Sequence, residues 1–202
     1  MNHCPPPCKP GPRRRPRRDA GFTLIEAALT MVIVGVGVLA MVSAQQAYHI
    51  KNQWAARTGT AQMLANEIRE ITLSLPQHDP AVGSTSLGPE ANEVLDADNL
   101  QTSVVNFDDL DDFAGVVDAT GDGSGLSFNP PINGLRLPIA DLDQWTQRIK
   151  VEKVSPENIS ATDGLPLRDD SDLMRITVDI LYQQGAGKKV ETATSMTWIV
   201  AP

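Results

Sequence analysis

Hydrophobic and polar residues follow three different patterns along this chain of 202 residues. The first is an almost continuous apolar run of 23 residues, 22–44, with the sequence FTLIEAALTMVIVGVGVLAMVSA, in which Glu26 is the single charge. About 20 apolar residues are enough to cross the hydrocarbon core of a bilayer. Residues 22–44 are therefore predicted to form a transmembrane helix.

The second pattern has a helical period and covers residues 45–76. Apolar residues recur at spacings of three, four and seven, as expected for one face of an amphipathic helix; they are Trp54, Ala61, Leu64, Ile68, Ile71 and Leu75. Pro76 is expected to stop the helix. Because no proline occurs between Phe22 and Leu75, the two halves are predicted to form one continuous spine.

The third pattern is alternation of apolar and polar residues, which is typical of strands with one buried face. It runs from Met174 to Tyr182 and from Val190 to Val200, and the segment between Trp145 and Val154 is a third strand candidate. Residues 184–188, Gln-Gly-Ala-Gly-Lys, are expected to form the hairpin loop, because glycine accepts positive φ. Residues 135–202 are thus predicted to be an antiparallel meander.

These patterns together predict an α+β fold, in which the Trp54–Leu75 stripe covers the apolar face of a small antiparallel sheet. Residues 77–134 lie between helix and meander. They are rich in Pro, Gly, Ser, Asn and Asp and have poor periodicity. We interpret this part as a long acidic loop region with short elements.

Charge is distributed unevenly. Residues 1–21 carry six basic residues and one acid, whereas the remainder carries 11 basic and 24 acidic residues. A basic head before an apolar run is a targeting pattern, and it keeps the N-terminus cytoplasmic and residues 77–202 extracytoplasmic. The acidic remainder argues against contact with nucleic acid. Both cysteines, Cys4 and Cys8, lie in this Pro-rich head, which we interpret as an unfolded leader rather than a metal site.

The residues Gly21-Phe22-Thr23-Leu24-Ile25-Glu26, placed between the basic head and the apolar run, resemble the processing site of type IV prepilins and type II secretion pseudopilins. The resemblance implies that a membrane prepilin peptidase cuts after Gly21 at the cytoplasmic face and methylates the amine of Phe22. A small residue such as Gly21 suits a narrow peptidase cleft.

The same resemblance gives a role to Glu26. A carboxylate inside a membrane segment is costly and usually has a partner. In the family, the matching glutamate is thought to pair with the N-terminal amine of a neighbouring subunit during filament assembly. The expected partners are therefore the peptidase, other pilin or pseudopilin subunits, and the inner membrane, with the protein anchored there or in a surface filament.

Two features set the chain apart from many major pilins: there is no proline midway through the helix, where Val42 and Ser43 stand, and no C-terminal cysteine pair. A minor pilin is therefore favoured, with a pseudopilin as the alternative. Adhesion, motility, DNA uptake and protein secretion all use such subunits, and the sequence does not distinguish them.

Two other readings remain open. The first is an ordinary membrane anchor in which Glu26 snorkels to the surface, with a binding module that acts outside any filament, in a Ca²⁺-dependent manner. The second is a signal peptide cut after Ala44, which would release a secreted enzyme.

The acidic residues of the loop region are the metal candidates: Asp108, Asp109, Asp111, Asp112, Asp118 and Asp122. Clustered carboxylates in glycine-rich loops supply the oxygen ligands that Ca²⁺ takes, and some pseudopilins bind calcium in a loop. Asp118 and Asp122 form the best pair. The spacing does not match an EF-hand, so we favour a solvated acidic loop without a cofactor.

Catalysis is not expected. His49 and His78 stand in no ligand or nucleophile motif, and no cysteine lies outside the leader. We interpret both histidines as exposed polar residues, and Trp54, Trp145 and Trp198 as core residues.

Overall fold

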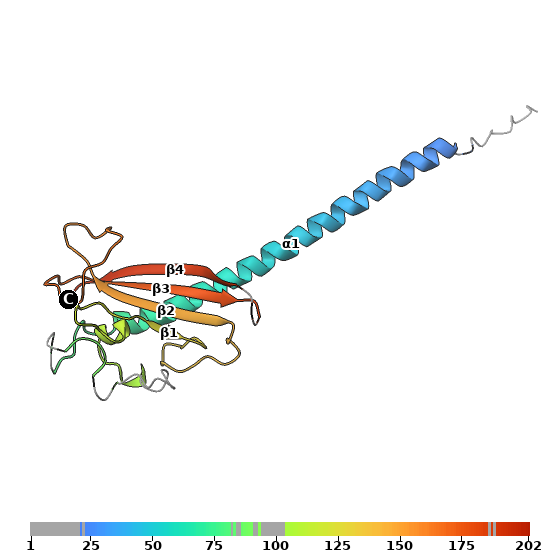
Figure 1. Cartoon of the computed structure of the whole chain (residues 1–202). Helices are drawn as coiled ribbons and strands as arrows, with labels where there is room; N and C mark the ends of the chain where they lie inside the picture. The colour runs from blue at the N-terminus through green and yellow to red at the C-terminus, as the bar shows by residue number, and fades with distance from the viewer. Residues whose placement is uncertain are drawn as a thin grey trace, which may run out of the picture. The chain divides into compact units, whose positions relative to one another are not determined.

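The computed structural model describes Gly21 and the ranges 23–81, 86–90, 104–185 and 189–202, together with Gly83, Glu93 and Gly187. Figure 1 shows the elements of this part: α1 (Leu24–Leu73), η2 (Val104–Asn106), η3 (Asp111–Ala114), β1 (Leu126–Phe128), β2 (Trp145–Lys153), β3 (Met174–Gln183) and β4 (Val190–Val200). The chain divides into two compact units, Met1–Ile50 and Lys51–Pro202.

The first unit contains the N-terminal part of α1. Its apolar side chains from Leu24 to Val42 are exposed, and none of the most apolar 18-residue window is buried. The mean hydropathy of that window is 2.3. In the described residues, α1 is one helix that is long and apolar enough to cross a membrane, as the sequence predicts.

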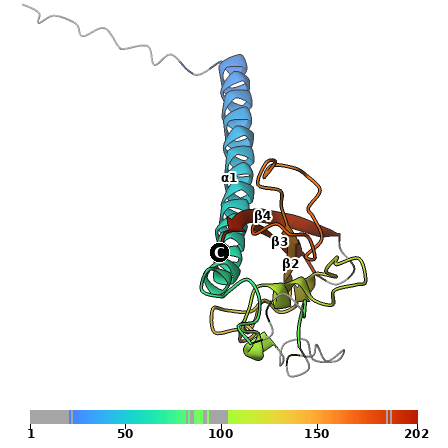
Figure 2. The same ribbon diagram turned by 90° about the vertical axis from the view of Figure 1, so that its left-hand side faces the viewer.

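The second unit packs the C-terminal part of α1 on the sheet, which confirms the predicted α+β fold (Figure 2). The buried residues of this helical segment are Ala61, Leu64, Ala65, Ile68, Ile71 and Thr72. The prediction that the buried stripe starts at Trp54 is wrong, since Trp54 is 70% exposed. Trp54 precedes Ala61 by seven residues, about 10 Å along a helix, and so lies beyond the face that meets the sheet.

The sheet is antiparallel, with the order β1-β2-β3-β4. Strands β2, β3 and β4 coincide closely with the predicted meander. Every second residue of β2 is buried, from Trp145 to Lys153, so the alternating sequence pattern predicted the buried face of this strand correctly. In the loop between β3 and β4, Gly185 and Gly187 have φ of 93° and 77°, as expected of a glycine hairpin. Strand β1, of three residues, is too short to show alternation and was not predicted.

The core lies between α1 and the sheet, and it includes Trp145 and the half-buried Trp198. One polar side chain crosses this core. Gln147, fully buried on β2, donates to the carbonyl of Leu64 at 2.9 Å and to that of Ile132 at 3.1 Å. It also accepts a hydrogen bond from the Ile132 amide at 2.7 Å. Gln147 therefore connects the sheet, the helix and the loop around Ile132.

Candidate functional site

Residues 104–114, which we call the acidic segment, fold against the core because their apolar residues recur every third position. Val104, Phe107, Leu110 and Phe113 are all fully or almost fully buried, and the two 3₁₀ helices η2 and η3 lie in this stretch. A 3₁₀ helix has three residues per turn, so residues three apart share a face. Phe107 and Phe113 pack edge to face, with ring centroids 5.2 Å apart.

This packing takes three aspartates into the interior. Asp109, Asp111 and Asp112 have exposed fractions of 1%, 0% and 0%, whereas Asp108 is exposed. The interpretation of this segment as a solvated acidic loop is therefore wrong for these three residues. They lie between the buried apolar positions of a tight helical turn, and their carboxylates are drawn in with them.

Asp111 has a partner for each carboxylate oxygen. Oδ1 accepts a hydrogen bond from the Gly88 amide at 2.8 Å, and Oδ2 lies 2.5 Å from Nδ1 of His78. Burial raises the pKa of Asp111 to about 7 and lowers that of His78, with the charge of Lys153 as a second cause. His78 is half-buried, which corrects the prediction that it is an exposed polar residue.

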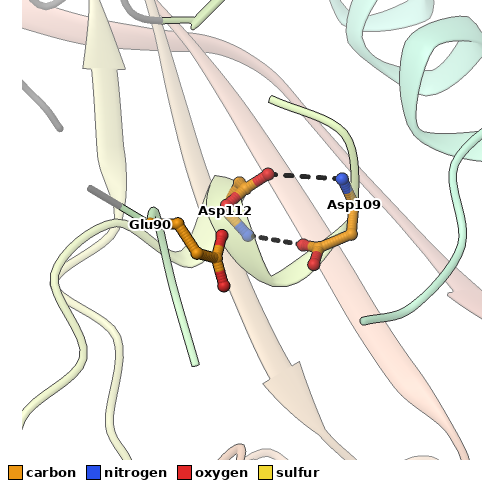
Figure 3. A group of neighbouring side chains, drawn as sticks. All are labelled: Glu90, Asp109 and Asp112. Carbon is orange, nitrogen blue, oxygen red and sulfur yellow. Dashed lines mark hydrogen bonds between the residues drawn. The ribbon is translucent and has the colours of Figure 1, made fainter. Parts of the chain in front are cut away.

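Asp109 and Asp112 hold each other through main-chain amides, as Figure 3 shows. The Asp112 amide donates to Asp109 Oδ1 at 3.1 Å, and the Asp109 amide donates to Asp112 Oδ2 at 3.2 Å. The other oxygen of each carboxylate, Asp109 Oδ2 and Asp112 Oδ1, is buried and has no hydrogen-bond partner in the described part of the chain. Buried polar atoms are rarely left in that state without an ion or a water.

Two glutamates, Glu90 and Glu93, lie close to these aspartates. Three carboxylate oxygens, one each from Glu90, Asp109 and Asp112, lie within 4.8 Å of one another, and Glu93, Asp108 and Asp112 form a second group of the same kind. Burial raises the pKa of Asp109 to about 8, with the charge of Asp111 as second cause, and that of Asp112 to about 7, with the charge of Asp109 as second cause. Burial also raises the pKa of Glu90 and Glu93. We call Glu90, Glu93, Asp109 and Asp112 the acidic cluster.

Asp118 and Asp122, the best predicted pair, lie elsewhere, on an exposed turn. Asp118 Oδ1 accepts hydrogen bonds from the Thr120 hydroxyl at 2.6 Å and from the Thr120 amide at 2.8 Å, and these bonds, the hydroxyl first, lower the pKa of Asp118. The Asp122 amide donates to the same oxygen at 3.1 Å. Neither aspartate belongs to a group of three acids in the described residues.

The structure thus separates the six predicted aspartates. It brings Asp109 and Asp112 together, places Asp108 beside Asp112, pairs Asp111 with His78, and leaves Asp118 and Asp122 on their own turn. Sequence reasoning missed Glu90 and Glu93, since about 20 residues separate them from the aspartates. The period of three in the apolar residues was the one available signal that this segment is not a solvated loop.

The second candidate site is the N-terminal segment around the first turn of α1, which begins at Leu24. The Glu26 amide donates to the Thr23 carbonyl at 3.0 Å and, more weakly, to the Thr23 hydroxyl at 3.4 Å. Glu26 is the one acidic residue of this turn and is exposed, as is Gly21. Leu24 and Ile25 are 92% and 78% exposed. Phe22, the predicted methylation position, lies outside the described residues.

Comparison with known families identifies this segment. The family model described as "Prokaryotic N-terminal methylation motif" matches residues 16–42. The chain carries a prokaryotic N-terminal methylation motif. The match includes Gly21, Phe22 and Glu26 and is consistent with a type IV pilin-like protein. Neither a search of curated proteins nor a search of solved structures found a match.

The methylation motif and the apolar helix occupy the same part of the chain. The matched residues 16–42 include the N-terminal part of α1, whose apolar side chains are exposed. A methylation motif followed by one apolar helix indicates membrane anchoring and a pilin-like or pseudopilin-like protein. Such proteins are usually structural subunits rather than enzymes.

Proposed function

We propose that this chain is a non-enzymatic minor subunit of a type IV pilus or a related filament. The observation that carries the proposal is the methylation motif at residues 16–42, joined to a helix whose apolar side chains are exposed from Leu24 to Val42. Apolar surface of this extent needs lipid or other helices around it. In a membrane it serves as an anchor, and in a filament the helices of neighbouring subunits cover it.

Processing follows from the motif. A prepilin peptidase cuts after Gly21 at the cytoplasmic face, and the new amine of Phe22 is methylated. The mature subunit then lacks both cysteines and the basic leader. Residues 77–202 lie on the extracytoplasmic side, since the basic residues precede the span.

The continuous course of α1 from Leu24 to Leu73 favours a minor subunit. Many major pilins have a proline within the apolar helix, and this chain has none between Phe22 and Leu75. A pseudopilin of a type II secretion system is the second candidate, since it shares the motif and this helix. Both candidates require the same cut after Gly21.

The mature N-terminus tests the proposal directly. The full chain is expressed in a bacterial host with an active prepilin peptidase, purified from membranes and analysed by mass spectrometry. We expect N-methylated Phe22 at the N-terminus. Gly21→Arg should leave the precursor uncut, because a long charged side chain does not fit a site for a small residue. Gly21→Ala is the matched control and should be processed.

The other outcomes are distinct. An intact Met1 in the wild-type chain would show a simple membrane anchor, and an N-terminal Gln45 would show signal-peptide cleavage after Ala44. Normal maturation of Gly21→Arg would contradict the proposed cleavage site. A host without the peptidase gives the reference for the uncut precursor.

A further inference from the structure

We propose that the acidic cluster binds one Ca²⁺ ion through Glu90, Asp109 and Asp112. The two aspartates lie in and beside η3, and Glu90 comes from a segment about 20 residues earlier in the chain. One oxygen from each of the three lies within 4.8 Å of the others (Figure 3). A metal at this point would join two loop segments that share no secondary structure.

The first argument is the set of buried oxygens without a partner. Asp109 Oδ2, Asp112 Oδ1 and both carboxylate oxygens of Glu90 are buried and make no hydrogen bond of normal geometry with the described part of the chain. Ser86 is close enough to Glu90 to influence its pKa, whereas the two aspartate oxygens carry the argument. Asp109 and Asp112 are 1% and 0% exposed. Leaving buried polar atoms unpaired is costly, and a cation between these oxygens would satisfy all three residues.

The second argument is charge. The ion pairs among the described residues are His78–Asp111, Arg148–Asp179, Lys150–Glu152 and Arg175–Glu152. None of them involves the acidic cluster. The nearby Arg136 directs its guanidinium at the carbonyls of Val104, Val105 and Phe107. Its charge acts on Asp112, Asp108 and Glu93 from a distance, but it forms no direct ion pair with the acidic cluster. Buried carboxylates that repel one another must bind either protons or a cation.

Asp111 provides the contrast within the same turn. Its oxygens are taken by the Gly88 amide and by His78, so it has no capacity left for a metal. Asp109 and Asp112 each accept a hydrogen bond from the other residue's main-chain amide through one carboxylate oxygen. The second oxygen of each carboxylate has no hydrogen bond within the described residues. The turn is therefore held rigid by one set of oxygens while the other set faces Glu90.

The chemistry of the donors selects the ion. All ligands are oxygens, and no histidine or cysteine belongs to either group of three, which disfavours Zn²⁺ and other transition metals. Ca²⁺ takes six to eight oxygens in flexible geometry, whereas Mg²⁺ requires near-ideal octahedral geometry and keeps several waters. Three carboxylates, two from the turn that includes η3 and one from the loop that holds Glu90, can bind through one or both oxygens and fit Ca²⁺. Glu93 and Asp108, grouped around Asp112, add negative charge beside the ion.

The test uses the full chain in detergent, freed of metal with a chelator, and Ca²⁺ itself as the probe. Isothermal titration should show one ion per chain. At a Ca²⁺ concentration of 100 times Kd, linkage predicts an increase in Tm of roughly 5–10 °C for a protein of this size. Mg²⁺ at the same concentration should give a smaller increase.

Amide variants locate the ion. Asp109→Asn and Asp112→Asn keep the side-chain shape and remove a buried charge, so both should fold without metal and lose the increase in Tm. Asp118→Asn is the matched control on the exposed turn and should respond as the wild type does. If both buried variants fail to fold, Glu90→Gln decides, because Glu90 is only half-buried.

Three results would overturn the proposal. A wild-type chain that binds no Ca²⁺ would show that protons alone neutralise the cluster. A normal Ca²⁺ response in Asp112→Asn or in Glu90→Gln would exclude these ligands. Loss of the response in Asp118→Asn alone would place the ion on the Asp118–Asp122 turn. None of these outcomes depends on whether the chain is cut after Gly21.

Discussion

The side-chain amide of Gln147 on β2 donates a hydrogen bond to the main-chain carbonyl of Leu64 on α1, at 2.9 Å inside the core. Gln147 is fully buried, and its remaining bonds go to the amide and carbonyl of Ile132. All of its polar atoms therefore have partners. A fully satisfied polar contact of this kind fixes one arrangement of helix, sheet and loop.

Gln147→Leu should destabilise the second unit. The variant keeps the approximate volume but leaves the buried amide and carbonyl of Ile132 without the glutamine, at an expected loss of about 3 kcal/mol. Urea unfolding of the full chain in detergent, followed by circular dichroism, measures the change. Gln62→Leu is the matched control, since Gln62 is exposed on α1, and it should change stability by less than about 0.5 kcal/mol.

Gly88 and Gly187 allow a second prediction, because both have φ of 77°. A Cβ on Gly187 would meet nothing within 4 Å, whereas a Cβ on Gly88 would lie 2.7 Å from the Gly115 carbonyl oxygen. Gly187→Ala should therefore cost about 1 kcal/mol, from the left-handed backbone alone. Gly88→Ala should cost about 2–4 kcal/mol, because the chain must also shift.

The same unfolding measurement compares the two glycine variants. Equal losses of stability would contradict the close approach of Gly88 to Gly115. Gly88 also donates its amide to Asp111, so its variant should disturb the segment that carries the acidic cluster. Gly187 lies in the β3–β4 loop and should leave that segment unchanged.

The elements that sequence analysis predicted are those with a strong period. Strands β2, β3 and β4 have nine to eleven residues, and each alternates long enough to show the face that meets the core. The apolar run of α1 and its amphipathic continuation were predicted for the same reason. The start of the buried helical face was not, because Trp54 has the right spacing but lies beyond the sheet.

In the acidic segment, hydropathy does not predict which carboxylates are buried. Asp109 and Asp112 look like surface residues by type, yet a tight turn between Phe107 and Phe113 buries them. Whether a carboxylate faces solvent depends on the turn, and the turn depends on packing against a distant core. Glu90 joins the pair only through the tertiary fold, so no local pattern could have included it.

Two cross-strand ion pairs on β2 and β3 give a third prediction. Glu152 faces Arg175, and Arg148 faces Asp179. In the first pair the side chains are 12% and 10% exposed, and in the second 56% and 25%. Arg175 also donates to the carbonyls of Ala161 and Thr162, so it holds the preceding loop against the sheet.

Arg175→Met should lower the free energy of unfolding by about 2–3 kcal/mol, because Glu152 and two loop carbonyls lose a largely buried donor. Arg148→Met is the matched control and should cost less than about 1 kcal/mol, since Arg148 is exposed to solvent. A double-mutant cycle with Glu152→Gln should give a coupling of at least about 0.5 kcal/mol. A coupling near zero would mean that Arg175 acts through the loop carbonyls alone.

The last prediction concerns Glu26 and rests on the proposed filament role. Glu26→Gln should still be cut after Gly21, because the cleavage site is unchanged. It should be lost from filaments sheared from the cell surface, because an amide offers no charge to the amine of a neighbouring subunit. Glu70→Gln is the matched control: Glu70 is exposed on the same helix, and its variant should be recovered in filaments as the wild type is.

This variant also separates assembly from helix capping. Glu26 stands in the first turn of α1, where a carboxylate favours the helix by about 0.3–1 kcal/mol through the helix dipole. Glutamine at that position still suits a capped N-terminus that begins at Thr23. If Glu26 only supports the first turn, Glu26→Gln should enter filaments almost normally. Immunoblots of the sheared fraction and of whole cells, at equal expression, distinguish the two roles.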